Sequence, residues 1–391
     1  MFNNKKPIII ILLFLLIFTF LYATDRIPFV YNGDSLSEVR AEFDLKNYGA
    51  DVNRILQDMT IEEKVGQMFM GCFYTGTPTA EIVEKYHLGS ILLFGASFEK
   101  TSKEKLSEKL SSIDTSCTLK PIIAVDEEGG TVTRASSSKA FRSSPFASAR
   151  KLYASGGLDA IIKDAHEKNA FLLNLGVNLN LAPVCDISKN PKDFMYSRSL
   201  GQDAQTTSLY AKEIVSACLE DEIGCALKHF PGYGNSADTH KGLVVDNRSL
   251  KQLKSSDLLP FKAGINAGAP AVLVSHNIVK AIDGNLPASL SPAVHRLLRE
   301  ELNFDGVIIT DDLSMDAINN YFPEADSAVT AVLAGNDILC TGDYKKQYTA
   351  VLNAVFNGDI SEKRIDSSVK KILLWKINLK LIDTTQQDSA E

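Results

Sequence analysis

The sequence lacks an excess of basic charge, and it has little cysteine for its 391 residues. Its 48 acidic side chains outnumber 41 basic ones, which gives a net charge of −7 and excludes the positive surface that nucleic-acid binding needs. Its 6 cysteines are too few for a disulfide scaffold, and because most stand in apolar stretches we expect buried free thiols. No Cys-x-x-Cys pair occurs, which disfavours a structural zinc site.

One long apolar run departs sharply from the rest of the sequence. After two lysines and a proline, residues 8–23 read IIIILLFLLIFTFLYA, and the chain then turns polar. A basic flank, an apolar segment of this length and a polar continuation are typical of a signal peptide, and a membrane anchor through residues 7–23 is the alternative. We therefore expect residues 1–23 to be a signal peptide or anchor, and the protein to be periplasmic, extracellular or held at the outer face of the cytoplasmic membrane.

Short apolar runs recur between a lead-in at residues 24–50 and a tail at 383–391 that we expect to be disordered. Each run is compatible with a buried parallel strand, and helical patterns lie between them. Eight strands alternating with helices predict a single (β/α)8 TIM-type barrel over residues 51–382, with a doubly wound open sheet as the alternative. The eight runs are 67–73, 89–95, 121–125, 177–184, 224–230, 270–276, 306–310 and 336–340.

Helix start and stop signals separate these runs. Thr60 and Glu63 form a capping box ahead of one helix, and Ser291-Pro292 opens another. Gly268 and Gly335 stand where helices should end before the next strand. These signals support the alternation of helices and strands.

Polar side chains follow several of the predicted strands at the point where each strand ends. Because the carboxyl ends of parallel strands meet at one end of a barrel, we expect these groups to form the site. Taken singly, Glu128 or Asp312 is equally well explained as a helix N-cap, and Asp246 as a surface carboxylate, but convergence from four strands is hard to explain by capping. The groups are Asp126 to Gly130, Lys228-His229, Ser275-His276 and Asp311-Asp312, with Arg198 in the stretch after the fourth run.

A loop within KHFPGYGNSADTH (228–240) places Asp238 two residues before His240. In an extended chain these two side chains point the same way, so the carboxylate can orient the imidazole and tune it for proton transfer near neutral pH. A hydrogen-bonded surface histidine is the plain alternative. A metal site built from His229, His240 and a carboxylate is a further one, but the spacing matches no familiar zinc-binding pattern.

Five motifs resemble, in the same order, those of the family 3 glycoside hydrolases, and in particular their bacterial β-N-acetylglucosaminidase branch. With ILQDMTIEEKVGQMFMG (55–71) and AGNDIL (334–339), the resemblance covers roughly residues 50–380. It implies a (β/α)8 barrel that acts on carbohydrate and needs neither a metal nor an organic cofactor. The five motifs are VDEEGGTVTR (125–134), SRSLGQD (197–203), KHFPGYGNSADTH (228–240), LPASLSP (286–292) and FDGVIITDDLSMDA (304–317).

The resemblance also implies a function and roles for single residues. The implied enzyme is a retaining exo-β-N-acetylglucosaminidase that removes terminal N-acetylglucosamine from peptidoglycan fragments or related glycosides. Asp311 matches the nucleophile that forms a covalent glycosyl-enzyme, and Asp312 is the less favoured candidate. His240, oriented by Asp238, matches the general acid/base of this branch. The positions that match sugar-holding groups are Asp126, Arg134, Arg198, Lys228 and His229.

Three features depart from the family pattern. Tyr233 stands where the family usually has His, Thr131 where it usually has Arg, and the stretch from Lys228 to the Asp-x-His pair is one residue shorter. A shorter loop would displace His240, and small displacements of catalytic groups reduce rates strongly.

Four other functions remain as alternatives at this point. Two lie within the family: a β-glycosidase acting on glucosides or xylosides, and a phosphorylase that uses phosphate in place of water. The third is an exported barrel that binds cell-wall sugars without cleaving them. The fourth is a metal-dependent hydrolase on the same fold.

Overall fold

The computed structural model of the protein describes residues 42–234, 242–322 and 324–384. The apolar run at residues 8–23 lies outside these ranges, as does most of the predicted tail. In the part of the chain that is described, no helix combines the length and the apolarity needed to cross a membrane. The first described helix, α2 (Glu42–Asp58), runs across residue 50, so the last residues of the predicted lead-in belong to a helix that packs on the barrel.

The fold is α/β, and its eight-stranded sheet is parallel throughout and nearly closed, consistent with a TIM-type barrel. The strands follow one another around the barrel in chain order, and the last strand lies beside the first. A parallel bridge between Ile309 and Ile338 links the two ends of the sheet, so the open-sheet alternative is wrong. The strands are β1 (Phe69–Phe73), β2 (Ser90–Leu93), β3 (Ile122–Val125), β4 (Leu179–Asn180), β5 (Gly224–Phe230), β7 (Ala271–Val274), β9 (Val307–Thr310) and β10 (Leu339–Thr341).

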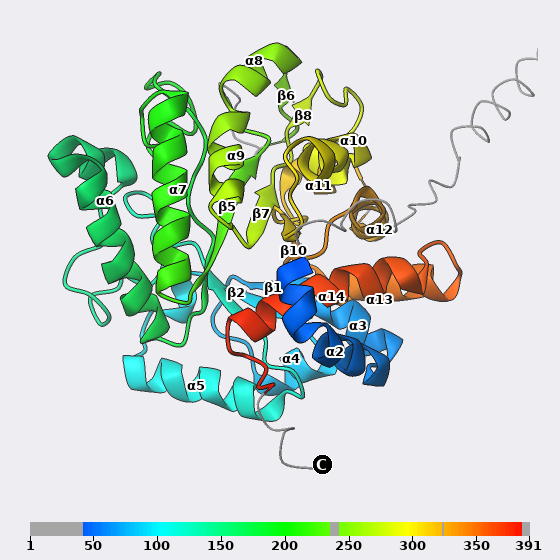
Figure 1. Ribbon diagram of the computed structural model, residues 1–391. Coiled ribbons are helices and arrows are strands. Elements are labelled where there is room, and N and C mark those ends of the chain that lie inside the picture. Colours follow the sequence, from blue (N-terminus) through cyan, green and yellow to red (C-terminus); the bar gives the residue numbers. More distant parts are fainter. Residues whose placement is uncertain (1–41, 235–241, 323, 385–391) are drawn as a thin grey trace, which may run out of the picture. The chain divides into compact units, whose positions relative to one another are not determined.

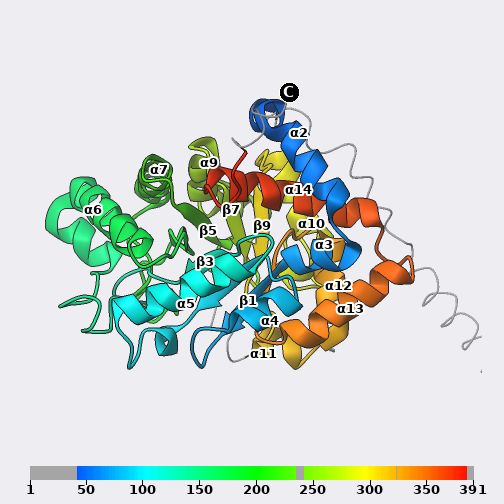
Figure 2. The same cartoon turned by 90° about the horizontal axis from the view of Figure 1, so that it is seen from below.

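Helices surround this barrel, and Figure 1 and Figure 2 show them outside the strands, with α2 beside α14. A separate two-stranded parallel ribbon joins β6 (Val245–Asp246) to β8 (Ile278–Val279). The remaining helices are α3 (Ile61–Gln67), α4 (Ala80–Lys85), α5 (Lys103–Ser116), α6 (Ala149–Leu173), α7 (Ala204–Glu220), α8 (Leu250–Ser255), α9 (Leu258–Asn266), α10 (Pro292–Arg296), α11 (Asp316–Asn319), α12 (Glu324–Ala334), α13 (Tyr344–Phe356) and α14 (Glu362–Asn378).

The predicted helix signals are confirmed in atomic detail. The Thr60 side chain accepts from the Glu63 N–H, and the Glu63 carboxylate accepts from the Thr60 N–H, which completes the capping box of α3. The Ser291 side chain caps α10, whose first residue is a proline. Gly268 and Gly335 follow α9 and α12 with φ of +96° and +119°, a backbone conformation that a residue with a Cβ rarely adopts.

Burial along the strands explains where the polar groups gather. β2, β3, β7 and β9 are aliphatic-rich and buried at every position, as expected of strands covered on both faces. β5 is also buried throughout, although it carries Lys228 and His229. A lysine and a histidine inside a barrel need charged or hydrogen-bonding partners, and those partners define the site described below.

All 6 cysteines lie in the described part of the chain and are free thiols. Five of them are buried, as predicted, and Cys117 is half-buried.

Candidate active site

A cavity of about 430 Å³ lies at the carboxyl ends of the barrel strands. Its walls come from segments that follow β1, β2, β3, β4, β5 and β9, so it stands where barrel enzymes hold their substrates. Two further predicted site residues, Asp238 and His240, lie outside the described residues. The predicted residues that line the cavity are Asp126, Arg134, Arg198, Lys228, His229 and Asp311.

A buried cluster of charges forms one wall of the cavity. The Lys228 ammonium Nζ lies 2.6 Å from Asp126 Oδ1 and 2.6 Å from Glu128 Oε1. Arg198 donates to the same Glu128 carboxylate through Nε at 2.9 Å and through its terminal nitrogen at 2.6 Å. Glu128 thus bridges two cations that come from different segments, and the helix-cap interpretation of this residue is wrong.

The electrostatics of the cluster favour its ionised form. Burial alone would raise the pKa of the Glu128 carboxyl, but the charges of Arg198 and Lys228 outweigh burial and hold the pKa well below its ordinary value. Burial would also lower the pKa of Lys228, yet Asp126 and Glu128 together raise it. Because such fixed charges form directional, charge-assisted hydrogen bonds, the wall is suited to holding the hydroxyl groups of a neutral polar ligand.

His229 is held between an acid and a guanidinium. Its Nδ1 lies 2.7 Å from Asp186 Oδ2, and its Nε2 lies 3.1 Å from the terminal nitrogen of Arg198. Arginine only donates, so we assign the ring proton to Nδ1 and the lone pair to Nε2. Because both ring nitrogens are engaged, His229 is unsuited to the metal site considered above, and the described residues contain no cluster of three or more His, Cys, Asp or Glu that would hold a metal ion.

Asp186 is a site residue that was missed in reading the sequence. Besides orienting His229, its other oxygen, Oδ1, accepts from the Tyr233 backbone N–H at 2.7 Å, so one carboxylate fixes both ends of this short turn. The Tyr233 ring is buried and packs edge-on against the His229 ring at 5.3 Å. Asp186 stands two residues after the run at 177–184, and the strand-end rule could have found it.

Arg134 is placed by a neighbouring buried carboxylate. Glu127 accepts the backbone N–H groups of Arg134, Ala135 and Ser136 at 2.8 to 3.3 Å, which shapes the segment after β3. The Arg134 guanidinium then lies over the Phe94 ring, 5.6 Å from its centre. The side chain therefore faces the cavity from a rigid turn.

Asp311 begins the segment that follows β9. Its N–H donates to Val274 O at 2.8 Å, and its Oδ1 accepts from the Asp312 N–H at 2.9 Å. The Asp312 carboxylate is held differently, because the Tyr74 hydroxyl donates to Oδ2 and the Ser314 N–H donates to Oδ1. The two aspartates therefore have distinct surroundings, and Asp312 is fixed by the protein.

Asp246 was expected at the surface, but it is only 4 % exposed. Arg248 binds both Asp246 oxygens and also donates to Asp257 Oδ1 at 2.6 Å and to Gly232 O at 3.2 Å. The surface interpretation of Asp246 is therefore wrong. Arg248 ties the chain just before residues 235–241 to the chain just after them.

A comparison with known protein families identifies the family to which the chain belongs. The model of the glycosyl hydrolase family 3 N-terminal domain matches residues 60–374 of the 391. The chain belongs to glycosyl hydrolase family 3.

Similar proteins place the chain within that family. It is 30% identical over 327 residues to the β-hexosaminidase LpqI of Mycobacterium tuberculosis. The aligned region covers 80% of this chain and 82% of that protein. A solved structure of M. tuberculosis LpqI is similar with a TM-score of 0.76 at 28% identity, covering 83% of this chain and 96% of the other. A family 3 β-N-acetylglucosaminidase from Paenibacillus sp. strain FPU-7 gives a TM-score of 0.77 at 30% identity, covering 85% and 66%. The prediction of a family 3 glycoside hydrolase similar to the β-N-acetylglucosaminidase branch is confirmed.

In this family 3 enzyme, Asp186→Asn is expected to lower kcat/KM by about 100-fold. An amide has one acceptor oxygen, so it loses either the bond to His229 Nδ1 or the bond to the Tyr233 N–H, and both groups move. Steady-state kinetics on 4-nitrophenyl β-N-acetylglucosaminide, with a pH profile of kcat/KM, measure the effect, which should appear mainly in KM. Asp193→Asn on the same segment is the control, because the Asp193 carboxylate bonds only to Ser188 and Asn190 among the described residues. Unchanged constants in a folded Asp186→Asn protein would contradict the positioning role.

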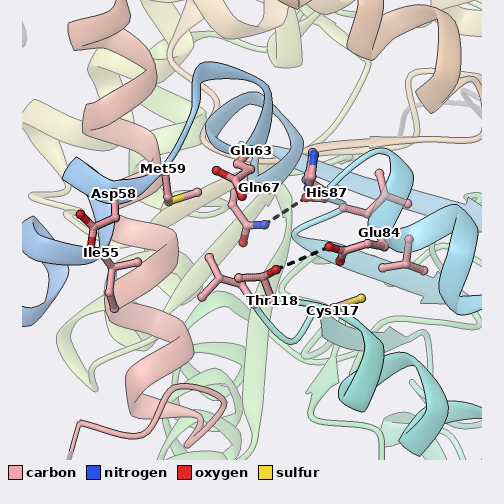
Figure 3. Close-up of a pocket in the computed structure, with 12 residues that line it drawn as sticks. Ile55, Asp58, Met59, Glu63, Gln67, Glu84, His87, Cys117 and Thr118 are labelled. Carbon is pink, nitrogen blue, oxygen red and sulfur yellow. Dashed lines mark hydrogen bonds between the residues drawn. The ribbon is translucent and has the colours of Figure 1, made fainter.

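A second cavity, of about 250 Å³, lies apart from this site (Figure 3). Gln67, His87 and Thr118 line it, and each precedes a barrel strand, so it stands at the amino ends of β1 to β3. Among the described residues, none of the predicted site residues lines it. The candidate active site is therefore the larger cavity at the opposite ends of the strands.

Proposed function

We propose that this enzyme is a retaining exo-β-N-acetylglucosaminidase. The observation that carries the proposal is the cluster of Asp126, Lys228 and Arg198, joined through Glu128, because its first three members line the same cavity as Asp311. The cluster presents charged hydrogen-bonding groups at fixed positions, and such groups hold sugar hydroxyls more strongly as charge develops in the transition state. The similarity to proteins named β-hexosaminidase and β-N-acetylglucosaminidase supports the N-acetyl sugar as substrate.

In the proposed mechanism the Asp311 carboxylate attacks the anomeric carbon as the glycosidic bond breaks. The leaving oxygen takes a proton from His240, and a covalent glycosyl-enzyme forms. His240 then takes a proton from water, which attacks the anomeric carbon and releases the sugar and Asp311. Asp238 orients His240 in this scheme.

The proposed natural substrate is terminal N-acetylglucosamine on peptidoglycan fragments or related glycosides. The cavity volume of about 430 Å³ suits one or two sugar units. Sugar-holding residues and Asp311 line the same cavity, so a terminal unit bound there occupies the space into which the proposed nucleophile faces.

The decisive experiment compares 4-nitrophenyl β-glycosides of N-acetylglucosamine, glucose and xylose, with water alone and with added inorganic phosphate. We expect kcat/KM for the N-acetyl sugar to exceed the others by at least about tenfold, because a site that hydrogen-bonds the acetamido group discriminates against sugars lacking it. Proton NMR of the first product should show the β-anomer, as two displacements retain configuration. Release of sugar 1-phosphate would identify a phosphorylase, the α-anomer an inverting enzyme, and no turnover by folded protein a binding barrel.

We also propose that the protein is exported, and the support is the sequence of residues 1–23 alone. A reporter enzyme fused after residue 30 should be translocated across the membrane. A matched fusion in which Leu13, Leu15 and Leu16 are replaced by Asp should remain inside, because charged residues prevent insertion of the apolar segment. Retention of the unmodified fusion in the cytoplasm would overturn the proposal.

A further inference from the structure

Two cysteine thiols touch inside the barrel, next to the active-site cavity. Cys72 on β1 and Cys340 on β10 place their Sγ atoms 3.3 Å apart. Both side chains are buried, at 4 % and 2 % exposure. The two strands pair in parallel, with Met70 opposite Cys340, so the thiols are diagonal neighbours on facing strands.

This contact lies at the seam where the barrel closes on itself. β1 is the first strand of the barrel and β10 is the last, and the two cysteines are 268 residues apart in the sequence. A covalent bond at this point would enclose nearly the whole barrel in one loop. Because a cross-link restricts the unfolded chain more strongly when the loop is longer, a bond here would restrict it more than a bond between any other two cysteines of the chain.

We propose that Cys72 and Cys340 form an oxidisable dithiol, which closes to a disulfide across the β1–β10 seam by exchange with an organic disulfide. Cys340 reacts first, because of the 6 cysteines it is the one that lines the active-site cavity. Its thiolate attacks one sulfur of the reagent, forms a mixed disulfide and releases the first thiol. The Cys72 thiolate then attacks the Cys340 sulfur and releases the second thiol. The two cysteines lose two electrons and two protons, and the reagent gains both.

The surroundings of the pair set the rate of this exchange. Burial raises the pKa of the Cys72 thiol well above its ordinary value, and Cys340 and Asp312 raise it further. For Cys340 the contact with Cys72 lowers the pKa, but burial and the nearby Asp312 and Asp311 carboxylates raise it overall. Since only the thiolate attacks, the exchange is slow near neutral pH and becomes faster as the pH rises.

A second pair of thiols in the chain provides an internal comparison. The Cys218 thiol on α7 lies near enough to Cys225, at the start of β5, to raise the pKa of that thiol. They are close in sequence and do not line the active-site cavity. A disulfide there would close a short loop, stabilise the fold less and lack the access route that Cys340 has.

The test uses the full chain, purified with a reductant that is then removed, and incubated with glutathione disulfide at pH 8.5. We expect the count of free thiols to fall from 6 to 4, and peptide mass spectrometry to find Cys72 joined to Cys340. The melting temperature should rise by on the order of 5 °C and return after treatment with dithiothreitol. Cys72→Ser and Cys340→Ser proteins should show no reversible rise.

Several results would overturn the proposal. They are 6 free thiols after prolonged oxidation, a bond between Cys218 and Cys225 in place of the seam bond, or a seam bond that leaves the melting temperature unchanged. Mass spectrometry of the unmutated protein decides the first two even if a serine variant does not fold. None of these measurements depends on glycosidase activity, so they stand apart from the proposed function.

Discussion

Asp311→Asn is expected to reduce kcat/KM for 4-nitrophenyl β-N-acetylglucosaminide by at least about 10⁴-fold. The amide cannot form the glycosyl ester, and it keeps the shape of the side chain, so the Asp312 N–H to Oδ1 bond has an equivalent in the variant. Substrate binding should persist, because the wall formed by Asp126, Lys228, Glu128 and Arg198 is untouched. Initial rates, together with equilibrium binding of N-acetylglucosamine, measure both effects.

Two matched variants sharpen this prediction. Asp316→Asn makes the same chemical change on an exposed residue in the first turn of α11, and it should leave activity unchanged. Asp312→Asn tests the rival nucleophile, whose oxygens already accept from Tyr74 and Ser314. It should reduce activity far less than Asp311→Asn. If Asp312→Asn were the variant without turnover, the assignment of Asp311 would be wrong.

The barrel was predictable from the sequence because strands that are buried on both faces appear as short, continuous apolar runs. All eight apolar runs contain or overlap a strand, and the helix signals at Thr60 and Ser291 act as expected. Strand lengths were less predictable, since only Leu179–Asn180 forms β4 within the run at 177–184. The end of that run forms an isolated bridge with β5, where the Lys228 backbone N–H donates to Pro183 O and the Lys228 C=O accepts from the Cys185 N–H. Such local pairing depends on the neighbouring strand and has no signal in the run itself.

The site was predictable where residues sit at strand ends and less so where their partners come from elsewhere. One cavity is lined, as predicted, by Asp126, Lys228 and Asp311, because each of these residues ends or follows a barrel strand. The ion pair between Glu128 and Arg198 joins residues that are 70 positions apart in the sequence, and no spacing rule predicts such a pair. The surface prediction for Asp246 was wrong because its carboxylate is buried against Arg248, two residues further along the chain. Sequence patterns reveal which end of the barrel is polar, and packing decides which polar groups pair.

Glu128→Gln is the second large effect that we expect, and it concerns stability. Removing one partner of a buried ion network leaves Lys228 and Arg198 without part of their neutralising charge, which should cost about 3 to 5 kcal/mol in the free energy of unfolding. Chemical denaturation at pH 7 measures the loss. The control is Glu222→Gln, because the Glu222 and Lys380 side chains are 58% and 68% exposed, and an exposed pair contributes no more than about 1 kcal/mol.

The pH dependence separates the effect of the lost charge from the effect of altered hydrogen bonding. The pKa of Glu128 is lowered in the folded state from an ordinary value of 4.5, so its ionic contribution is fully present above that pH and is lost as the pH falls toward the lower folded value. The difference in unfolding free energy between the wild type and Glu128→Gln should therefore be constant from pH 7 to about pH 5 and shrink at lower pH. A difference that stayed constant down to pH 3 would show that Glu128 contributes through hydrogen bonds that do not depend on its charge, and the electrostatic explanation of its effect on stability would then be wrong.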